Sequence, residues 1–170
     1  GPFHYWTTGV KELWQPDPTP STSEDDSVPP ESRPTHYWIY SPGRGASEWP
    51  EFSAAGIMAI GWDELGDLAQ YPDREAIRQA LDVDNSGDPM SNNVLALWQF
   101  QHEMAEGDIV YAKRGRDEIV GRGVVRSAAR FDPDRASYHH VRSVEWTHMG
   151  VWPHPGKAVT KTLTDITVYR

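Results

Sequence analysis

The sequence predicts an α+β domain built on a curled, barrel-like mixed β-sheet of five to six strands, flanked by about three short helices. Three observations lead to this class. Short apolar or alternating runs typical of strands are separated by turn residues along the chain. These runs do not alternate regularly with helices, as they do in a parallel α/β sheet. One longer segment carries apolar residues at helical spacing.

The 170 residues divide into three parts. Residues 1–14 are an orphan aromatic and apolar segment, which we interpret as the end of a preceding element or as a segment that docks back onto the domain. Residues 15–35 are rich in Pro, Ser and acidic residues and predict a disordered linker. Residues 36–170 carry the strand and helix patterns and form the folded domain.

The domain opens with an aromatic, alternating run at 36–40, which predicts a strand. A glycine-rich loop follows. Ser47 can then cap a short helix over 48–55 that ends at Gly56. The apolar run at 57–62 predicts a short buried strand.

Two further helices are expected in the middle of the chain. Residues 73–81 form a helix capped by Asp73. The clearest helix runs over 92–106, with Ser91 or Asn92 as its cap and an apolar stripe at helical spacing on one face.

The remaining strands follow the longest helix. Residues 108–113 and 118–126 flank a turn at 114–117 and predict a β-hairpin. Residues 138–146 predict a later strand. Residues 147–170 carry loop signals and one closing strand.

Composition limits the chemistry. The chain has no Cys, which excludes disulfides, thiol nucleophiles and thiolate zinc sites and fits a reducing compartment such as the cytoplasm. His139 and His140 are adjacent on a strand and point to opposite faces, so they do not form a metal site together. No apolar run is long enough for a membrane span. No catalytic or phosphate-binding motif stands out, so we expect a non-enzymatic domain without metal or cofactor.

Charge and aromatic content indicate a nucleic-acid partner. The formal net charge is −9, but residues 113–170 hold 11 basic and 6 acidic residues, a net charge of +5. A basic final third can present one cationic face to phosphates. The chain also has 8 Trp, and such an excess favours a pocket or stacking surface for a flat ligand.

Four ordered segments sharpen this interpretation: HYWIY at 36–40, GIMAIGWDELGDL at 56–68, NNVLALWQFQHEMAEGDIVYAKRG at 92–115 and EIVGRGVV at 118–125. Together they resemble the EVE domain, a sister of the YTH domain within the PUA-like superfamily, and most of all the variant fused to McrBC-type restriction ATPases. KTLTDIT at 161–167 also fits the end of such domains. The resemblance implies a curled-sheet fold whose pocket accepts a methylated base flipped out of nucleic acid. One departure is Gly-Trp-Asp-Glu at 61–64, where the more widespread EVE proteins have Gly-Val-Arg-Asn.

The residues expected around the base lie at strand ends, in the adjoining loop and on the helices. They are Trp62, Asp63, Trp49, Tyr40, Ser41, Trp98, Asn92 and Asn93. Trp62 is the first candidate for a pocket wall, and Asp63 could accept a hydrogen bond from an exocyclic amine. Each has an alternative: the aromatic residues could pack in the core, Asp63 could cap a turn, and the Asn pair could cap a helix.

Phosphate contacts are expected from arginines and a lysine near the hairpin and on one strand face, which would make binding fall with salt. They are Arg44, Lys113, Arg114, Arg116, Arg122, Arg126 and Arg142.

The leading hypothesis is a DNA-binding specificity domain of a modification-dependent restriction system, partnered by an effector ATPase or nuclease. It would read a base such as N6-methyladenine or 5-methylcytosine in double-stranded DNA by flipping it into the pocket. Three alternatives stay open: an RNA-binding YTH-like or PUA-like reader, a small hydrolase acting on a modified nucleoside, and a protein-interaction domain with a Trp-rich groove.

Overall fold

The computed structural model describes residues 33–81, 88–154 and 161–167. The predictions for the segment 1–14 and for most of the linker therefore lie outside the described residues. Within the described part, six strands form one curled mixed sheet in the order β2-β6-β4-β3-β1-β7, and a two-residue strand, β5, pairs with β6. The strands are β1 (Tyr37–Tyr40), β2 (Ile57–Ile60), β3 (Ile109–Arg114), β4 (Glu118–Val125), β5 (Arg130–Phe131), β6 (His140–Pro153) and β7 (Leu163–Asp165).

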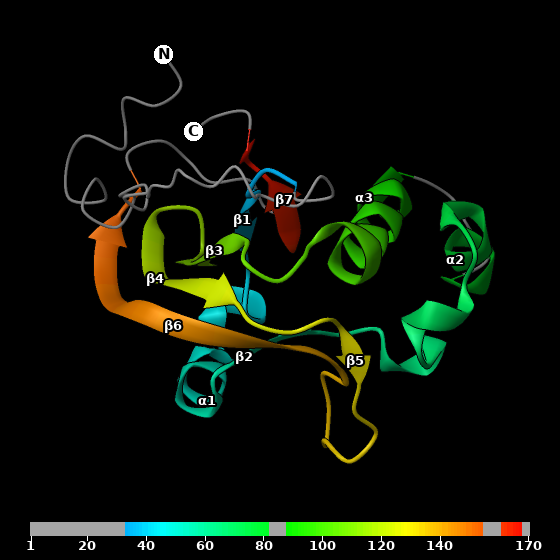
Figure 1. Ribbon diagram of the computed structural model, residues 1–170, viewed down its shortest axis with the longest axis horizontal. Helices are drawn as coiled ribbons and strands as arrows, with labels where there is room; N and C mark the ends of the chain where they lie inside the picture. The colour runs from blue at the N-terminus through cyan, green and yellow to red at the C-terminus, as the bar shows by residue number, and fades with distance from the viewer. Residues whose placement is uncertain (1–32, 82–87, 155–160, 168–170) are drawn as a thin grey trace, which may run out of the picture.

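Three helices flank the sheet, as Figure 1 shows: α1 (Trp49–Ala55), α2 (Arg74–Leu81) and α3 (Asp88–Trp98). Helices α2 and α3 lie together at one end of the molecule, and α1 lies apart from them beneath β2 and β6. The predicted α+β class, with a curled mixed sheet and three short helices, is confirmed. No helix among the described residues is long and apolar enough to span a membrane.

The strand pairing brings the ends of β1 and β3 and the start of β7 to one edge of the sheet. Strand β1 pairs in parallel with β3, placing Tyr40 opposite Ala112, and antiparallel with β7, placing Tyr40 opposite Leu163. The loop after β1 therefore leaves the sheet beside the β3–β4 turn and beside the start of β7. Its first residue, Ser41, donates its backbone N–H to the Thr162 carbonyl at 2.9 Å.

Most helix and strand predictions agree with the structure. Asp73 caps α2 by accepting the Ala76 N–H at 2.9 Å, and α1 ends at Gly56 in a left-handed conformation. The predicted cap at Ser47 is wrong, because Glu48 precedes α1 and no side chain caps its first turn.

The longest helix departs most from the prediction. It begins at Asp88, so Ser91 and Asn92 lie inside it and do not cap it. The α-helix ends at Trp98 and continues as a π-helical turn, Gln99–Glu103, after which Met104 is extended. A tertiary contact accounts for this end: the Arg142 guanidinium donates to the carbonyls of Phe100 and Met104 at 2.7 Å each. These carbonyls have no partner within the helix.

Candidate functional site

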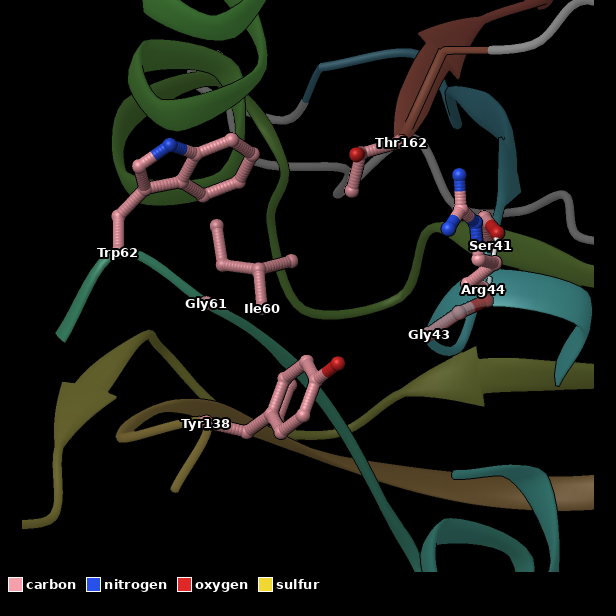
Figure 2. Close-up of a pocket in the computed structure, with 9 residues that line it drawn as sticks. Ser41, Gly43, Arg44, Ile60, Gly61, Trp62, Tyr138 and Thr162 are labelled. Atoms are coloured by element: carbon pink, nitrogen blue, oxygen red, sulfur yellow. Dashed lines mark hydrogen bonds between the residues drawn. The ribbon is translucent and has the colours of Figure 1, made fainter. Parts of the chain in front are cut away.

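A cavity of about 370 Å³ opens where β1 and β2 end. Figure 2 shows Trp62 and Tyr138 on one side of it, with Ile60 between them, and Ser41 and Arg44 on the other. The described residues that line it are Ser41, Gly43, Arg44, Ala59, Ile60, Gly61, Trp62, Tyr138 and Thr162. Three of the residues predicted for nucleic-acid binding, Ser41, Arg44 and Trp62, thus line one pocket.

The first aromatic wall, Trp62, has an unusual backbone. Its φ of 66° and ψ of 44° place it in the left-handed region, which costs a non-glycine residue on the order of 1–3 kcal/mol. The surrounding hydrogen bonds hold this conformation. The Trp62 carbonyl accepts the Leu65 N–H at 3.1 Å and lies 3.0 Å from His140 Nε2. A carbonyl only accepts, so the neutral His140 ring carries its proton on Nε2.

The second aromatic wall, Tyr138, was not among the predicted site residues. It sits in the loop before β6 and also has a left-handed φ, of 57°. In Figure 2 its hydroxyl points across the pocket toward the side of Arg44 and Ser41. The strand predicted over 138–146 would begin at Tyr138. The left-handed backbone of this residue has no signal in the sequence, because a tyrosine beside a strand usually has an extended backbone. The pairing of this loop with residue 62 is long-range and carries no local pattern.

Asp63 joins the two walls. Its carboxylate accepts the backbone N–H groups of Tyr138 at 3.1 Å and His139 at 2.8 Å. Asp63 is not in the described pocket lining, and its carboxylate acts as a backbone cap, which is the alternative predicted for it. The cap here closes a turn that is distant in sequence.

The opposite rim is a tight loop. Gly43, Gly45 and Ala46 all have positive φ, at 80°, 61° and 61°. The loop exposes Arg44, which is the cationic side chain in the pocket lining. Ser41 and Thr162 add a hydroxyl each. The pocket therefore offers two aromatic faces on one side and polar and cationic groups on the other.

Two further predicted wall residues lie outside the described pocket lining: Tyr40 is in the core, and Trp49 is half-buried against it. Tyr40 is fully buried, and its hydroxyl donates to the Ala59 carbonyl and accepts the Ala59 N–H, so it ties β1 to β2. Burial raises its pKa far above the ordinary value, so the phenol stays neutral. Trp49 packs edge-on against Trp146, with ring centroids 4.7 Å apart, and lies over Gly121 of β4.

The predicted residues on α3 also lie outside the pocket lining. Trp98 is half-buried against the main core and packs on His102 with ring centroids 4.0 Å apart. Asn92 is exposed and Asn93 half-buried within the helix.

Three predicted phosphate contacts are buried. Arg142 is 2% exposed and donates to four backbone carbonyls, those of Phe100, Gln101, Met104 and Ser127, which makes it a structural residue. Burial lowers its pKa to about 10, so it stays charged at neutral pH. Arg122 and Lys113 are 7% and 2% exposed. Burial, assisted by Arg116, lowers the pKa of Lys113 to about 8.

Four predicted phosphate contacts are exposed. Arg44, Arg114 and Arg116 lie at the sheet edge that carries the pocket, because β1 and β3 end there. Arg126 follows the far end of β4 and pairs with Glu145 at 2.6 Å. The structure adds Lys161, an exposed residue next to Thr162, to the pocket edge.

Tyr138 and His140, beside the pocket walls, stay neutral around pH 7. Burial, with smaller effects from Glu48 and Asp63, raises the pKa of Tyr138, so its hydroxyl can donate a hydrogen bond. Burial lowers the pKa of His140. The described part of the chain contains no cluster of three or more side chains suited to hold a metal ion.

One known protein family matches most of this chain. The family described as "Domain of unknown function (DUF8426)" matches residues 38–170. No curated protein matches the chain. Among solved structures, the chain is similar to the YTH domain of the Zygosaccharomyces rouxii MRB1 protein, crystallised in complex with N6-methyladenosine RNA. The sequence identity is 13%, the TM-score is 0.38, and the match covers 75% of this chain and 70% of the other.

Proposed function

This chain belongs to the family described as a domain of unknown function (DUF8426), and we propose that its activity is to read a modified base in nucleic acid without catalysing a reaction. The base enters the pocket between Trp62 and Tyr138. The observation that carries the proposal is that two aromatic residues, both held in costly left-handed backbone conformations, face one cavity beside an exposed arginine. Backbone strain of this kind clusters at binding sites, where the surrounding structure maintains it.

The chemistry of the lining suits a flipped base. Stacking contributes about 1–3 kcal/mol per base, whereas flipping costs a few kcal/mol, so the two nearly cancel. Discrimination must then come from polar contacts to the base edge and from the shape of the wall. Ser41, Thr162 and the Tyr138 hydroxyl can supply the polar contacts, and Arg44 can neutralise the adjoining phosphate.

The finer proposal is an EVE-like specificity domain for modified double-stranded DNA in a restriction system, where a separate ATPase or nuclease would act. Its support is the sequence resemblance together with the pocket. Under the alternative of an RNA reader, the same pocket would take a base from single-stranded RNA.

A binding titration tests the proposal. Duplexes that are unmodified or carry N6-methyladenine, 5-methylcytosine or 5-hydroxymethylcytosine are compared with RNA strands that are unmodified or carry N6-methyladenosine. Trp62→Ala and Tyr138→Ala are compared with the wild type, and Trp98→Ala, an aromatic change outside the pocket lining, is the matched control.

We expect one modified nucleic acid to bind at least tenfold more tightly than its unmodified form, and both wall variants to remove that preference, since stacking on each wall contributes about 1–3 kcal/mol. Equal binding of all probes by the wild type, or full preference retained in both wall variants, would exclude the pocket as a base reader. A preference confined to RNA would overturn the DNA assignment alone.

A further inference from the structure

We propose that Arg135 is a positioning residue for the pocket, which fixes the Tyr138 wall by bonding its backbone while Glu51 of α1 fixes Arg135. The inference rests on the proposed function, because it gives the pocket a wall that is set before the base arrives. Arg135 is not in the pocket lining and would act entirely through Tyr138.

The contacts of Arg135 form a short chain from α1 to the wall. Its terminal nitrogens donate to the two carboxylate oxygens of Glu51 at 2.8 and 3.0 Å, a bidentate pair. Its Nε donates to the Tyr138 carbonyl at 3.0 Å and to the Ser137 carbonyl at 3.2 Å. The guanidinium is therefore held at one end and binds the loop backbone at the other.

A ring contact runs parallel to this chain. The Arg135 guanidinium carbon lies 5.6 Å from the centre of the Phe52 ring, and the Tyr138 ring packs edge-on against the same ring at 5.6 Å. Phe52 is fully buried in α1. Helix α1 thus supports Tyr138 through its ring and, by way of Arg135, through its backbone.

The backbone of Tyr138 needs this support. A left-handed φ at a tyrosine is unfavourable and persists only when its surroundings impose it. Asp63 holds the N–H of Tyr138, and Arg135 holds its carbonyl, so both ends of the residue are bonded. Removing Arg135 releases one of these two anchors and lets the wall leave its position.

A purely structural role for Arg135 makes a different prediction. The Glu51 carboxylate is half-exposed, and ion pairs of this type contribute little to global stability. If Arg135 only stabilised the fold, its loss would lower the unfolding midpoint and leave the affinity of the folded protein unchanged. If Arg135 positions the wall, its loss should leave the midpoint nearly unchanged and weaken binding. Arg126, which pairs with Glu145 at the far end of β4, is the matched control for removing an exposed ion pair.

The test uses Arg135→Gln, Tyr138→Ala, the double variant and Arg126→Gln. Each is titrated with the N6-methyladenine, 5-methylcytosine and 5-hydroxymethylcytosine duplexes and with the N6-methyladenosine RNA strand. A second readout needs no ligand: the protein is labelled with 3-fluorotyrosine, and the ¹⁹F resonance of residue 138, assigned by its loss in Tyr138→Phe, is compared between the wild type and Arg135→Gln.

We expect Arg135→Gln to bind the best probe roughly tenfold more weakly, or about 1.4 kcal/mol, which falls in the middle of the range of coupling between residues in contact. In the Tyr138→Ala background the same change should cost less than about twofold, because the two residues act as one unit. The resonance of residue 138 should shift or broaden in Arg135→Gln and stay unchanged in Arg126→Gln.

An unchanged resonance together with unchanged affinity in Arg135→Gln would overturn the inference, and so would a full tenfold loss in the Tyr138→Ala background. If the wild type binds none of the probes, the reader proposal fails by itself. The ¹⁹F resonance still decides the positioning role, which is supported if the signal changes and overturned if it does not.

Discussion

At the scale of single residues, a few buried polar side chains hold the fold around the pocket. Asp108, which is 1% exposed, accepts five hydrogen bonds on its carboxylate. Its carboxylate accepts from two nitrogens of Arg33 and from the Trp38 indole, at 2.9–3.0 Å, and from the backbone N–H groups of His36 and Ala105. One carboxylate thus joins the start of β1, the end of the π-helical turn and the start of β3.

Replacing the Asp108 carboxylate tests how much it contributes to the free energy of unfolding. Asp108→Asn keeps the shape but turns an NH₂ group toward donors, and it leaves buried N–H groups unsatisfied. We expect a loss of about 2–4 kcal/mol in the free energy of unfolding, measured by urea denaturation. Asp73→Asn is the control, because asparagine caps a helix about as well as aspartate. A loss below about 1 kcal/mol for Asp108→Asn would show that the fold does not depend on the hydrogen bonds of this carboxylate.

His140 gives the fold a pH dependence with a defined sign. Burial lowers its pKa in the folded state below the ordinary value of 6.5. As the pH falls below 6.5, the unfolded chain takes up the proton first, so stability is lost as the pH approaches the folded-state pKa. The wild-type unfolding midpoint should therefore drop more between pH 7.5 and 5.5 than that of His140→Gln, whose side chain can still donate to the Trp62 carbonyl. Equal drops in both proteins would assign the acid sensitivity to other groups.

At the scale of elements, the two glycines of β4 explain how aromatic residues pack on a strand. A Cβ on Gly123 would lie 2.6 Å from Val144 and 2.8 Å from both the Glu145 carbonyl oxygen and the Trp146 ring. A Cβ on Gly121 would lie 2.4 Å from the Trp49 ring. Both glycines belong to the Gly-x-Gly segment that the sequence resemblance singled out, and the structure gives them a packing role.

A pair of glycine variants separates packing from the pocket. Gly123→Ala should lower the free energy of unfolding by roughly 1–3 kcal/mol, because the clash includes backbone and a rigid ring. Gly61→Ala meets nothing within 4 Å and should stay within about 0.5 kcal/mol of the wild type. Because Gly61 lines the pocket, this second change should still weaken base binding. Thermal unfolding and the binding titration together check both, and a destabilised Gly61→Ala would contradict the open space.

Local sequence patterns predicted the helices and strands well, but they predicted only one of the two aromatic walls of the pocket. Strand alternation, the Asp73 cap and the hairpin turn are encoded within a few residues, and these predictions hold. The π-helical turn depends on Arg142, which lies about forty residues away along the chain. Sequence reasoning reached Trp62 because it ends a strand beside a turn. Tyr138 contacts Asp63, Arg135 and Phe52, and no spacing rule in the sequence reveals these long-range contacts.

At the scale of the whole molecule, the sheet topology separates the four exposed predicted phosphate contacts and Lys161 into two groups. Because β1 and β3 are parallel and β7 begins beside the end of β1, Arg44, Arg114, Arg116 and Lys161 are placed along the edge that holds the pocket. Arg126 is exposed at the opposite end, next to the start of β3, where Gly107 bonds to the Val125 carbonyl. A nucleic-acid strand whose base enters the pocket should run along the edge that holds the pocket. Phosphate contacts are therefore expected from the basic residues of that edge.

Salt dependence distinguishes the two ends of the sheet. For the best-binding duplex, each phosphate contact contributes about 0.9 to the slope of log K against log salt concentration. Lys161→Gln should lower that slope by about one contact and weaken binding to modified and unmodified duplexes alike, because Lys161 is not in the pocket lining. Arg44→Gln should do the same and also reduce discrimination, since Arg44 lines the pocket. Arg126→Gln should leave the slope unchanged. If Arg126→Gln lowers the slope while Lys161→Gln does not, the nucleic acid follows the other end of the sheet, and the pocket at the β1–β2 edge cannot be where the base enters.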